Sequence, residues 1–269
     1  MLGKLLKYEF RVNLWAIPCL AAIAALLYGG AWFGKWIQIS QISMAASVGL
    51  LLVGIAALIL AFILAVLRYY KGLFGAEGYL SQTLPVGKGA LLASKLIVAL
   101  VWILVGGIVF VAALIGFLQV QGLLDGMAQS FRAMAQYLAP LFIWMGASVA
   151  VQMVCALSEI YFAITLAHTR PFLGNPVIFS ILFYFAGQMV VGILELAGIL
   201  LIPMGMKFQG DGMAFVWEGM LPTMLDAMGN PELTNGATIG FGSLLMDLAA
   251  AVVFLMLSRW LMMKKASVK

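Results

Sequence analysis

The chain has 269 residues, of which 65% are hydrophobic and only 9% are charged, and its formal net charge is +5. Soluble domains carry about 25% charged residues, so this composition excludes a water-soluble globular protein. The apolar residues form long uninterrupted runs and not the short alternating segments of a transmembrane barrel, which indicates an all-α polytopic membrane protein. The two cysteines, Cys19 and Cys155, lie inside apolar runs and do not indicate a disulfide.

The first fifteen residues, MLGKLLKYEFRVNLW, predict an amphipathic helix that lies on the membrane surface. At helical spacing one face is polar and the opposite face is apolar, with Glu9 as the exception. The polar face carries Lys4, Lys7, Tyr8 and Arg11, and the apolar face carries Leu2, Leu5, Leu6 and Val12. The apolar run that follows continues to Phe33, which is long enough to span a bilayer, so we interpret it as a retained helix and not a cleaved signal peptide.

Six apolar runs of roughly 20 residues or more follow one another, and each is long enough to cross ~30 Å of hydrocarbon. They are approximately Leu14–Phe33, Met44–Leu67, Leu96–Leu118, Tyr137–Leu157, Pro176–Ile202 and Thr238–Met262. We therefore expect one transmembrane domain over residues 1–269, with six spans.

The basic residues predict the orientation of these spans, because Lys and Arg gather in cytoplasmic loops. If the N-terminus is cytoplasmic, twelve of the 15 basic residues lie inside: Lys4, Lys7, Arg11, Arg68, Lys71, Lys88, Lys95, Arg170, Arg259, Lys264, Lys265 and Lys269. Only Lys35, Arg132 and Lys207 fall outside. We expect both termini to be cytoplasmic. The charge is therefore an orientation signal, and no nucleic-acid partner is predicted, because no soluble domain carries a basic face.

The longest polar stretch on the cytoplasmic side connects spans two and three, over residues 68–95. Glycines allow tight turns there, and Leu84-Pro85 ends any continuing helix. Apolar and aromatic side chains lie among them at Leu73, Phe74, Tyr79 and Leu80. Such side chains on the wet side of a membrane protein suit a groove on a partner protein. The alternative is a plain loop that follows the positive-inside rule.

Around this stretch the sequence GLFGAEGYLSQTLPVGKGALLASKLIVALVW resembles the first cytoplasmic loop of ABC transporter permeases of the type-two, exporter-like class. The match is local, covering about thirty residues, and the six-span plan extends it loosely to the whole chain. The matching residues are Glu77, Gly78, Tyr79, Leu80, Thr83, Leu84, Pro85 and Lys95.

This resemblance implies that the chain is a permease subunit of an ATP-driven exporter in a bacterial cytoplasmic membrane. It implies that the loop, including Leu73 and Phe74, is the coupling helix that docks on a separate ABC ATPase subunit. It also implies a second permease subunit, identical or a sister chain. The chain itself lacks the phosphate-binding sequence G-x-x-x-x-G-K-[ST], so we expect no enzymatic activity and no cofactor in this polypeptide.

On the outer side, residues 203–237 form a long segment between spans five and six. Apolar residues recur there at three-four spacing, which predicts short helices over residues 212–229. Pro222 is well placed to begin one of them and Gly229 to end it. The pattern fits either a face that packs under a loop or two helices that dip into the outer leaflet, and the resemblance favours the second.

Several polar residues lie inside the predicted spans: Gln152, Gln188, Glu195 and Asp247. A charged acid at mid-bilayer costs roughly 2.5–3.5 kcal/mol, so such a residue is protonated, paired or directed to the protein interior. Two interpretations are open, a polar line along a substrate or ion path and hydrogen bonding between helices. The lone His168 is expected to be a solvated turn residue.

The rival function is an ion-coupled secondary transporter or channel that uses Glu195 and Asp247. An inverted repeat would favour this rival, and no convincing repeat is present. A membrane enzyme is disfavoured because H-E-x-x-H is absent.

Overall fold

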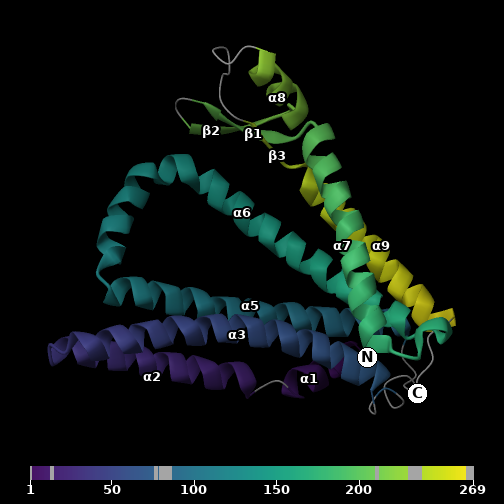
Figure 1. The fold of residues 1–269 in the computed structure, drawn as a ribbon, viewed down its shortest axis with the longest axis horizontal. Coiled ribbons are helices and arrows are strands. Elements are labelled where there is room, and N and C mark those ends of the chain that lie inside the picture. The colour runs from purple at the N-terminus through teal and green to yellow at the C-terminus, as the bar shows by residue number, and fades with distance from the viewer. Residues whose placement is uncertain are drawn as a thin grey trace. The chain divides into compact units, whose positions relative to one another are not determined.

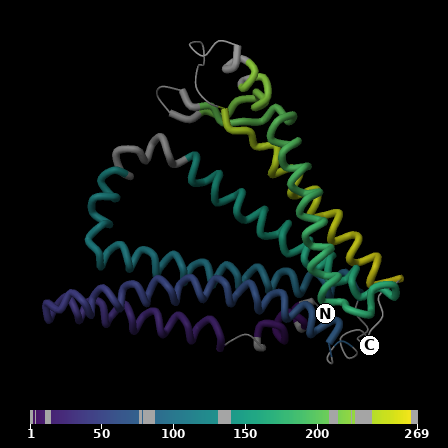
Figure 2. Tube along the Cα trace, viewed as in Figure 1, coloured from purple at the N-terminus to yellow at the C-terminus, as the bar shows by residue number. Residues whose placement is uncertain are grey.

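The computed structural model describes residues 2–12, 15–75, 78, 87–209, 212–229 and 238–264. The chain forms two compact units, which divide between Phe131 and Arg132. Figures 1 and 2 trace the path of the chain through both units. Each unit is described by itself.

The first unit contains the helices α1 (Leu2–Val12), α2 (Ala16–Trp36), α3 (Ser40–Phe74) and α5 (Lys88–Val120). Helix α1 confirms the short amphipathic helix that the sequence predicts, with Tyr8 72% exposed. Helices α2, α3 and α5 lie alongside one another (Figure 1). Their buried positions are mostly small residues, which allow the backbones of apolar helices to approach closely.

The antiparallel pair α3 and α5 shows why small residues are needed. A Cβ atom at Gly106 would lie 2.8 Å from Cβ of Ala61 and 3.1 Å from the carbonyl oxygen of Ala57. A Cβ atom at Gly54 would lie 2.7 Å from Cβ of Ala113. Side chains larger than hydrogen at these two glycines would therefore separate the helices.

Helices α3 and α5 contain 35 and 33 residues. At 1.5 Å per residue each is about 50 Å long, well beyond the ~30 Å of a hydrocarbon core. Residues 68–74 continue α3 and residues 88–95 open α5, so the two helices are joined through residues 75–87. Both ends of the predicted cytoplasmic segment 68–95 are therefore helical.

The second unit contains most of α6 (Leu123–Ala167), the short 3₁₀ helix η1 (Arg170–Phe172), α7 (Pro176–Leu201) and α9 (Gly242–Lys264). Helices α7 and α9 cross closely at Gly198 and Gly242, which are in direct contact. A small core of Cys155, Val191, Ala250 and Ala251 joins α6, α7 and α9. Phe162 stacks on Phe254 beside it, with ring centroids 5.4 Å apart.

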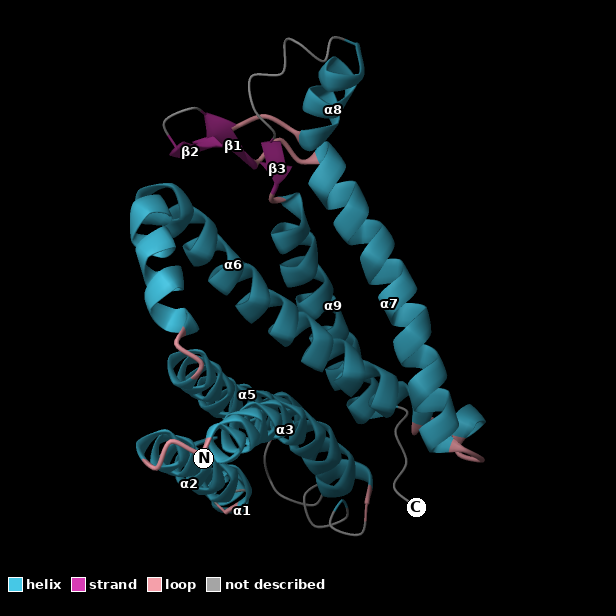
Figure 3. Ribbon diagram, turned by 60° about the vertical axis from the view of Figure 1, so that its left-hand side comes forward, coloured by secondary structure: helices cyan, strands magenta, loops and turns pink. Residues whose placement is uncertain are grey.

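The segment between α7 and α9 differs from the expected pair of helices over 212–229 (Figure 3). Residues Gly205–Gln209 (β1), Gly212–Val216 (β2) and Thr238–Gly240 (β3) form an antiparallel sheet in the order β2-β1-β3. Among the described residues of this segment, only α8 (Met220–Gly229) is helical, and it ends at the predicted Gly229. Asp211-Gly212, between two short apolar runs, is a hairpin signal that competes with the three-four spacing and prevails over residues 212–216.

Six described helices are long and apolar enough to cross a membrane: Ala16–Trp36, Ser40–Phe74, Lys88–Val120, Pro140–Ala167, Pro176–Leu201 and Gly242–Lys264. This confirms the predicted six-span, helical class of membrane protein. The fourth span runs ten residues beyond the expected end at Leu157. His168 caps its end and is only 5% exposed, with Nδ1 2.7 Å from the carbonyl oxygen of Ile164, so the expectation of a solvated residue is wrong.

Candidate functional site

Three charged residues from three helices meet in the first unit. Arg68 Nε and Lys95 Nζ each donate to the Glu9 carboxylate, over 2.8 Å in both cases, to Oε2 and Oε1 respectively. The three residues lie on α3, α5 and α1. The sequence pattern marked Glu9 as the exception on the amphipathic helix, and its ion pairs explain that exception. We call Glu9, Arg68 and Lys95 the ion cluster.

The ion cluster is largely buried, so the fold depends on its charges remaining paired. The Lys95 side chain is 3% exposed and that of Glu9 is 11% exposed. The ammonium group occupies space that exists because residue 72 is glycine, since a Cβ atom there would lie 2.5 Å from Lys95 Nζ. A buried charge pair stabilises a protein only with good geometry and complete pairing, and the loss of one partner is strongly destabilising.

The charges of the ion cluster also set the titration of Glu9. Burial by itself raises the pKa of the Glu9 carboxyl, but the charge and hydrogen bond of Lys95, together with those of Arg68, outweigh burial. The pKa of Glu9 therefore lies below its ordinary value of 4.5. Glu9 is ionised at neutral pH and holds α1 against the ends of α3 and α5.

The predicted coupling residues begin beside the ion cluster. Leu73 is fully buried and Phe74 is 6% exposed, with its ring 6.3 Å from that of Tyr69. The exposure expected for these two is wrong, because the last turn of α3 packs them into the first unit. Gly78 donates its N–H to the carbonyl oxygen of Gly75 over 2.8 Å. The other predicted coupling residues, Glu77, Tyr79, Leu80, Thr83, Leu84 and Pro85, lie outside the described residues.

A second polar group lies within the membrane-spanning helices of the second unit. Asp247 on α9 is 1% exposed, and neither of its carboxyl oxygens has a hydrogen-bond partner among the described residues. Its carboxyl lies within interaction range of Glu195 on α7. The structure thus brings together the two acids that the sequence identifies.

Glu159 on α6 is a third acid that sequence analysis missed. It is 1% exposed and accepts a hydrogen bond from Gln188 Nε2 to Oε2 over 2.6 Å, whereas Oε1 has no partner among the described residues. A Cβ atom at Gly187 would lie 2.5 Å from that oxygen. Glu159 also lies within electrostatic range of Glu195. We call Glu159, Glu195 and Asp247 the carboxyl cluster.

The remaining predicted intramembrane residue does not join this cluster. Gln152 on α6 is exposed on the surface of the second unit. The side chain on α6 that faces the carboxyl cluster is Cys155, which is buried within electrostatic range of all three acids.

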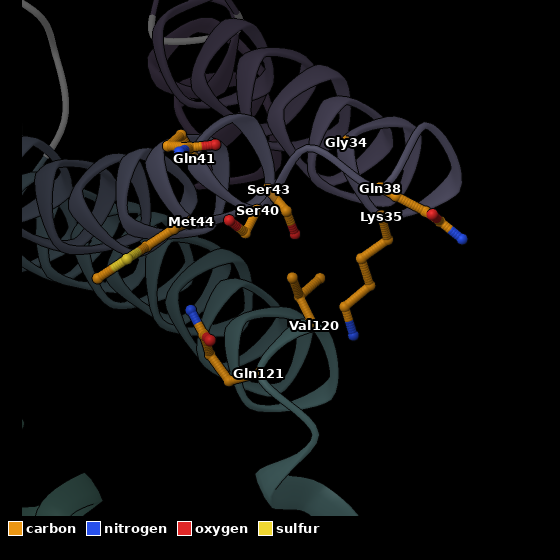
Figure 4. Close-up of a pocket in the computed structure, with 9 residues that line it drawn as sticks. All are labelled: Gly34, Lys35, Gln38, Ser40, Gln41, Ser43, Met44, Val120 and Gln121. Carbon is orange, nitrogen blue, oxygen red and sulfur yellow. The ribbon is translucent and has the colours of Figure 1, made fainter.

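An open pocket of about 450 Å³ lies in the first unit, between the turn from α2 to α3 and the end of α5 (Figure 4). The lining is largely polar: Gly34, Lys35, Gln38, Ser40, Gln41, Ser43, Met44, Val120 and Gln121. Gln121 Nε2 donates to Ser47 Oγ over 3.0 Å beside it.

A second pocket, of about 480 Å³, is apolar and lies in the second unit between α6, the sheet and α9. The rings of Trp144 and Phe241 stack there with centroids 3.7 Å apart. Within the described residues, no group of three or more His, Cys, Asp or Glu side chains is placed to hold a metal ion.

No protein-family model matches the chain, and comparisons with curated proteins and with solved structures found no significant match.

Proposed function

We propose that this chain is the membrane-spanning permease subunit of an ATP-driven exporter of the type-two class, in the cytoplasmic membrane of a bacterium. In this proposal it works with a separate ABC ATPase subunit and a second permease subunit, identical or a sister chain. The chain moves a substrate across the bilayer, and the ATPase supplies the energy.

The observation that carries the proposal is the construction of the α3–α5 hairpin. Close packing at Gly54 and Gly106 lets the two helices move as one body. The connection at 75–87 lies at one end of that body, and the ion cluster ties α1 to the same end. A force applied to the connection by a motor protein would therefore reach two membrane-spanning helices and the interfacial helix together.

The sequence of this connection supports the same proposal. It contains Glu77, Gly78 and the Thr83-Leu84-Pro85 run that resemble the coupling loop of type-two permeases. With Leu73 and Phe74 buried in the first unit, the remaining apolar candidates for an ATPase contact are Tyr79 and Leu80. Anchors of this kind in a groove contribute ~2 kcal/mol or more each to binding.

The test is co-expression of the chain with an ABC ATPase subunit from the same genome, followed by purification through a tag on the permease. We expect the ATPase to co-purify and Tyr79→Ala with Leu80→Ala to weaken the complex by a few powers of ten. A matched control is Trp217→Ala with Leu221→Ala, another aromatic and leucine pair, which is exposed in the segment between α7 and α9. Full retention of the ATPase by the first double variant would remove the coupling role.

The carboxyl cluster favours a second candidate, an ion-coupled carrier. A buried, unpartnered Asp247 in a span is costly unless a cation or proton accompanies it. If the chain is such a carrier, proteoliposomes without ATP should show transport that Asp247→Asn abolishes. If transport needs ATP and survives this substitution, the exporter proposal stands and the carrier is excluded.

A further inference from the structure

The carboxyl cluster contains three acids, and no basic side chain in the described part of the second unit pairs with them. Glu159, Glu195 and Asp247 come from three different membrane-spanning helices. None of them forms an ion pair in the described part of the second unit, where Lys207 pairs instead with Glu218 over 3.1 Å. Three ionised carboxyls in that environment would repel one another and would each carry a desolvation cost.

Unpartnered oxygens show where a positive charge would be held. Both Asp247 oxygens and Glu159 Oε1 are buried without hydrogen-bond partners among the described residues. Glu159 already uses its other oxygen to accept from Gln188, which positions it at one side of the cluster. Both Asp247 oxygens are unpartnered, and its helix α9 packs against α7, the helix of Glu195, close to the contact of Gly198 with Gly242. This pair therefore retains the greatest unused capacity for a proton or cation.

The geometry favours a proton over a metal ion. Metal ions need several ligands at fixed distances, and the described residues contain no group of three placed for that purpose. A proton needs only two carboxyl oxygens, and two neighbouring carboxyls hold one readily because both cannot ionise without repulsion. Apolar neighbours such as Val191, Ala250 and Ala251 exclude water from this side of the cluster.

We propose that Asp247 and Glu195 form an intramembrane proton-binding pair. One proton is held between the two carboxyls, and it is released when the carboxyl O–H bond breaks and water accepts the proton. The other titratable groups near the pair are Cys155 and Glu159 on α6 and Tyr184, which interacts with Glu159, on α7. This site belongs to the chain alone and does not depend on an ATPase partner.

Dicyclohexylcarbodiimide is a suitable probe, because it partitions into apolar sites and reacts with protonated carboxyls. The full-length chain in lipid nanodiscs is treated with this reagent from about pH 5 to pH 9. Peptide mass mapping then locates the adducts. We expect labelling at Asp247 or Glu195 that falls about tenfold per pH unit above its midpoint. Glu218, 52% exposed, is the control and should react with a water-soluble carbodiimide instead.

Substitution of one partner tests whether the proton is shared. Asp247→Asn and Glu195→Gln each remove one of the two carboxyls that hold the proton, so the remaining acid should be labelled less than in the wild type at the same pH. Asp125→Asn, an exposed acid of α6, is the matched control and should leave both profiles unchanged. The wild-type profile is informative by itself if either variant fails to fold.

Three results would overturn the proposal. The first is an absence of adducts on both acids at the lowest pH. The second is labelling that stays constant across the range, which would indicate permanently protonated structural groups. The third is protection by Na⁺ at fixed pH and ionic strength, which would indicate a metal cation. Since no ATPase is present in the assay, none of these results bears on the exporter proposal.

Discussion

The ammonium group of Lys95 is buried at the start of α5, and its stability there depends on one carboxylate. Glu9 lies 86 positions away in the sequence and accepts a bond from that ammonium group, while Arg68 occupies its other oxygen. Each partner therefore satisfies a charge that would otherwise be buried alone. At the residue scale, this makes Glu9 the group that fixes the interfacial helix to the membrane-spanning hairpin.

Glu9→Gln tests this role by leaving Lys95 buried without a negative partner. We expect a loss of about 3 kcal/mol of stability, because an uncompensated charge remains in the interior. Lys71→Gln, an exposed charge near the end of α3, is the matched control and should change stability by less than about 0.5 kcal/mol. Thermal unfolding in detergent, followed by size-exclusion chromatography, measures both variants. Equal midpoints for Glu9→Gln and the wild type would contradict the role.

The same residue predicts a pH dependence. Because the folded pKa of Glu9 lies below its ordinary value of 4.5, the unfolded chain binds this proton more readily than the folded chain. Its stabilisation is therefore complete above pH 4.5 and is lost as the pH falls through the folded pKa. The difference in midpoint between wild type and Glu9→Gln should shrink over this acid range. A difference that stays constant with pH would show that ionisation of Glu9 is not responsible.

At the scale of elements, the α3–α5 hairpin depends on small residues that recur along its interface. Glycine and alanine let the backbones approach, so dispersion contacts and not the hydrophobic effect hold two helices together in lipid. The hydropathy of the sequence predicts the helices. The residues at the interface between them are identified by the glycines at which an added side chain would clash with the other helix.

Adjacent glycines on α5 give a matched test of this packing. Gly106→Leu places a side chain where a Cβ atom alone would lie 2.8 Å from Ala61, so we expect destabilisation of at least about 1–3 kcal/mol from overpacking. Gly107→Leu introduces the same side chain at a position with no atom within 4 Å of the added Cβ, and we expect near wild-type stability. Thermal midpoints that rank the two variants equally would refute the interface.

At the scale of the whole molecule, six helices long and apolar enough to cross a membrane predict that the two termini lie on the same side of the bilayer. The distribution of twelve of the 15 basic residues then predicts that this side is the cytoplasm. The same distribution predicts that the connection at 75–87 is cytoplasmic, as the proposed exporter function requires.

Cysteine accessibility in intact cells tests this orientation. In a background with Cys19→Ala and Cys155→Ala, the Asp226→Cys variant should react with a membrane-impermeant maleimide and the Gly87→Cys variant should react only after lysis. Gly87 is suitable because an added Cβ atom there meets nothing within 4 Å. Reaction of Gly87→Cys in intact cells would reverse or abolish the proposed orientation.

The sequence by itself determined the features that depend on local composition. Hydropathy predicted six helices, and helical spacing predicted the amphipathic α1. It also identified Glu195 and Asp247, because an acid within an apolar run is conspicuous wherever its helix packs. Glu159 escaped notice because the apolar run was expected to end at Leu157, whereas the backbone hydrogen bonds of α6 continue to Ala167.

Only the tertiary structure decided which distant residues meet. The partners in the ion cluster are 59 and 86 positions apart, and the hydrogen bond from Gln188 to Glu159 spans 29 positions. The burial of Leu73 and Phe74 likewise depends on what packs against the last turn of α3. Local sequence sets the free energy of forming a helix and placing it in lipid, whereas contacts between helices depend on the shape of both surfaces, which no single segment encodes.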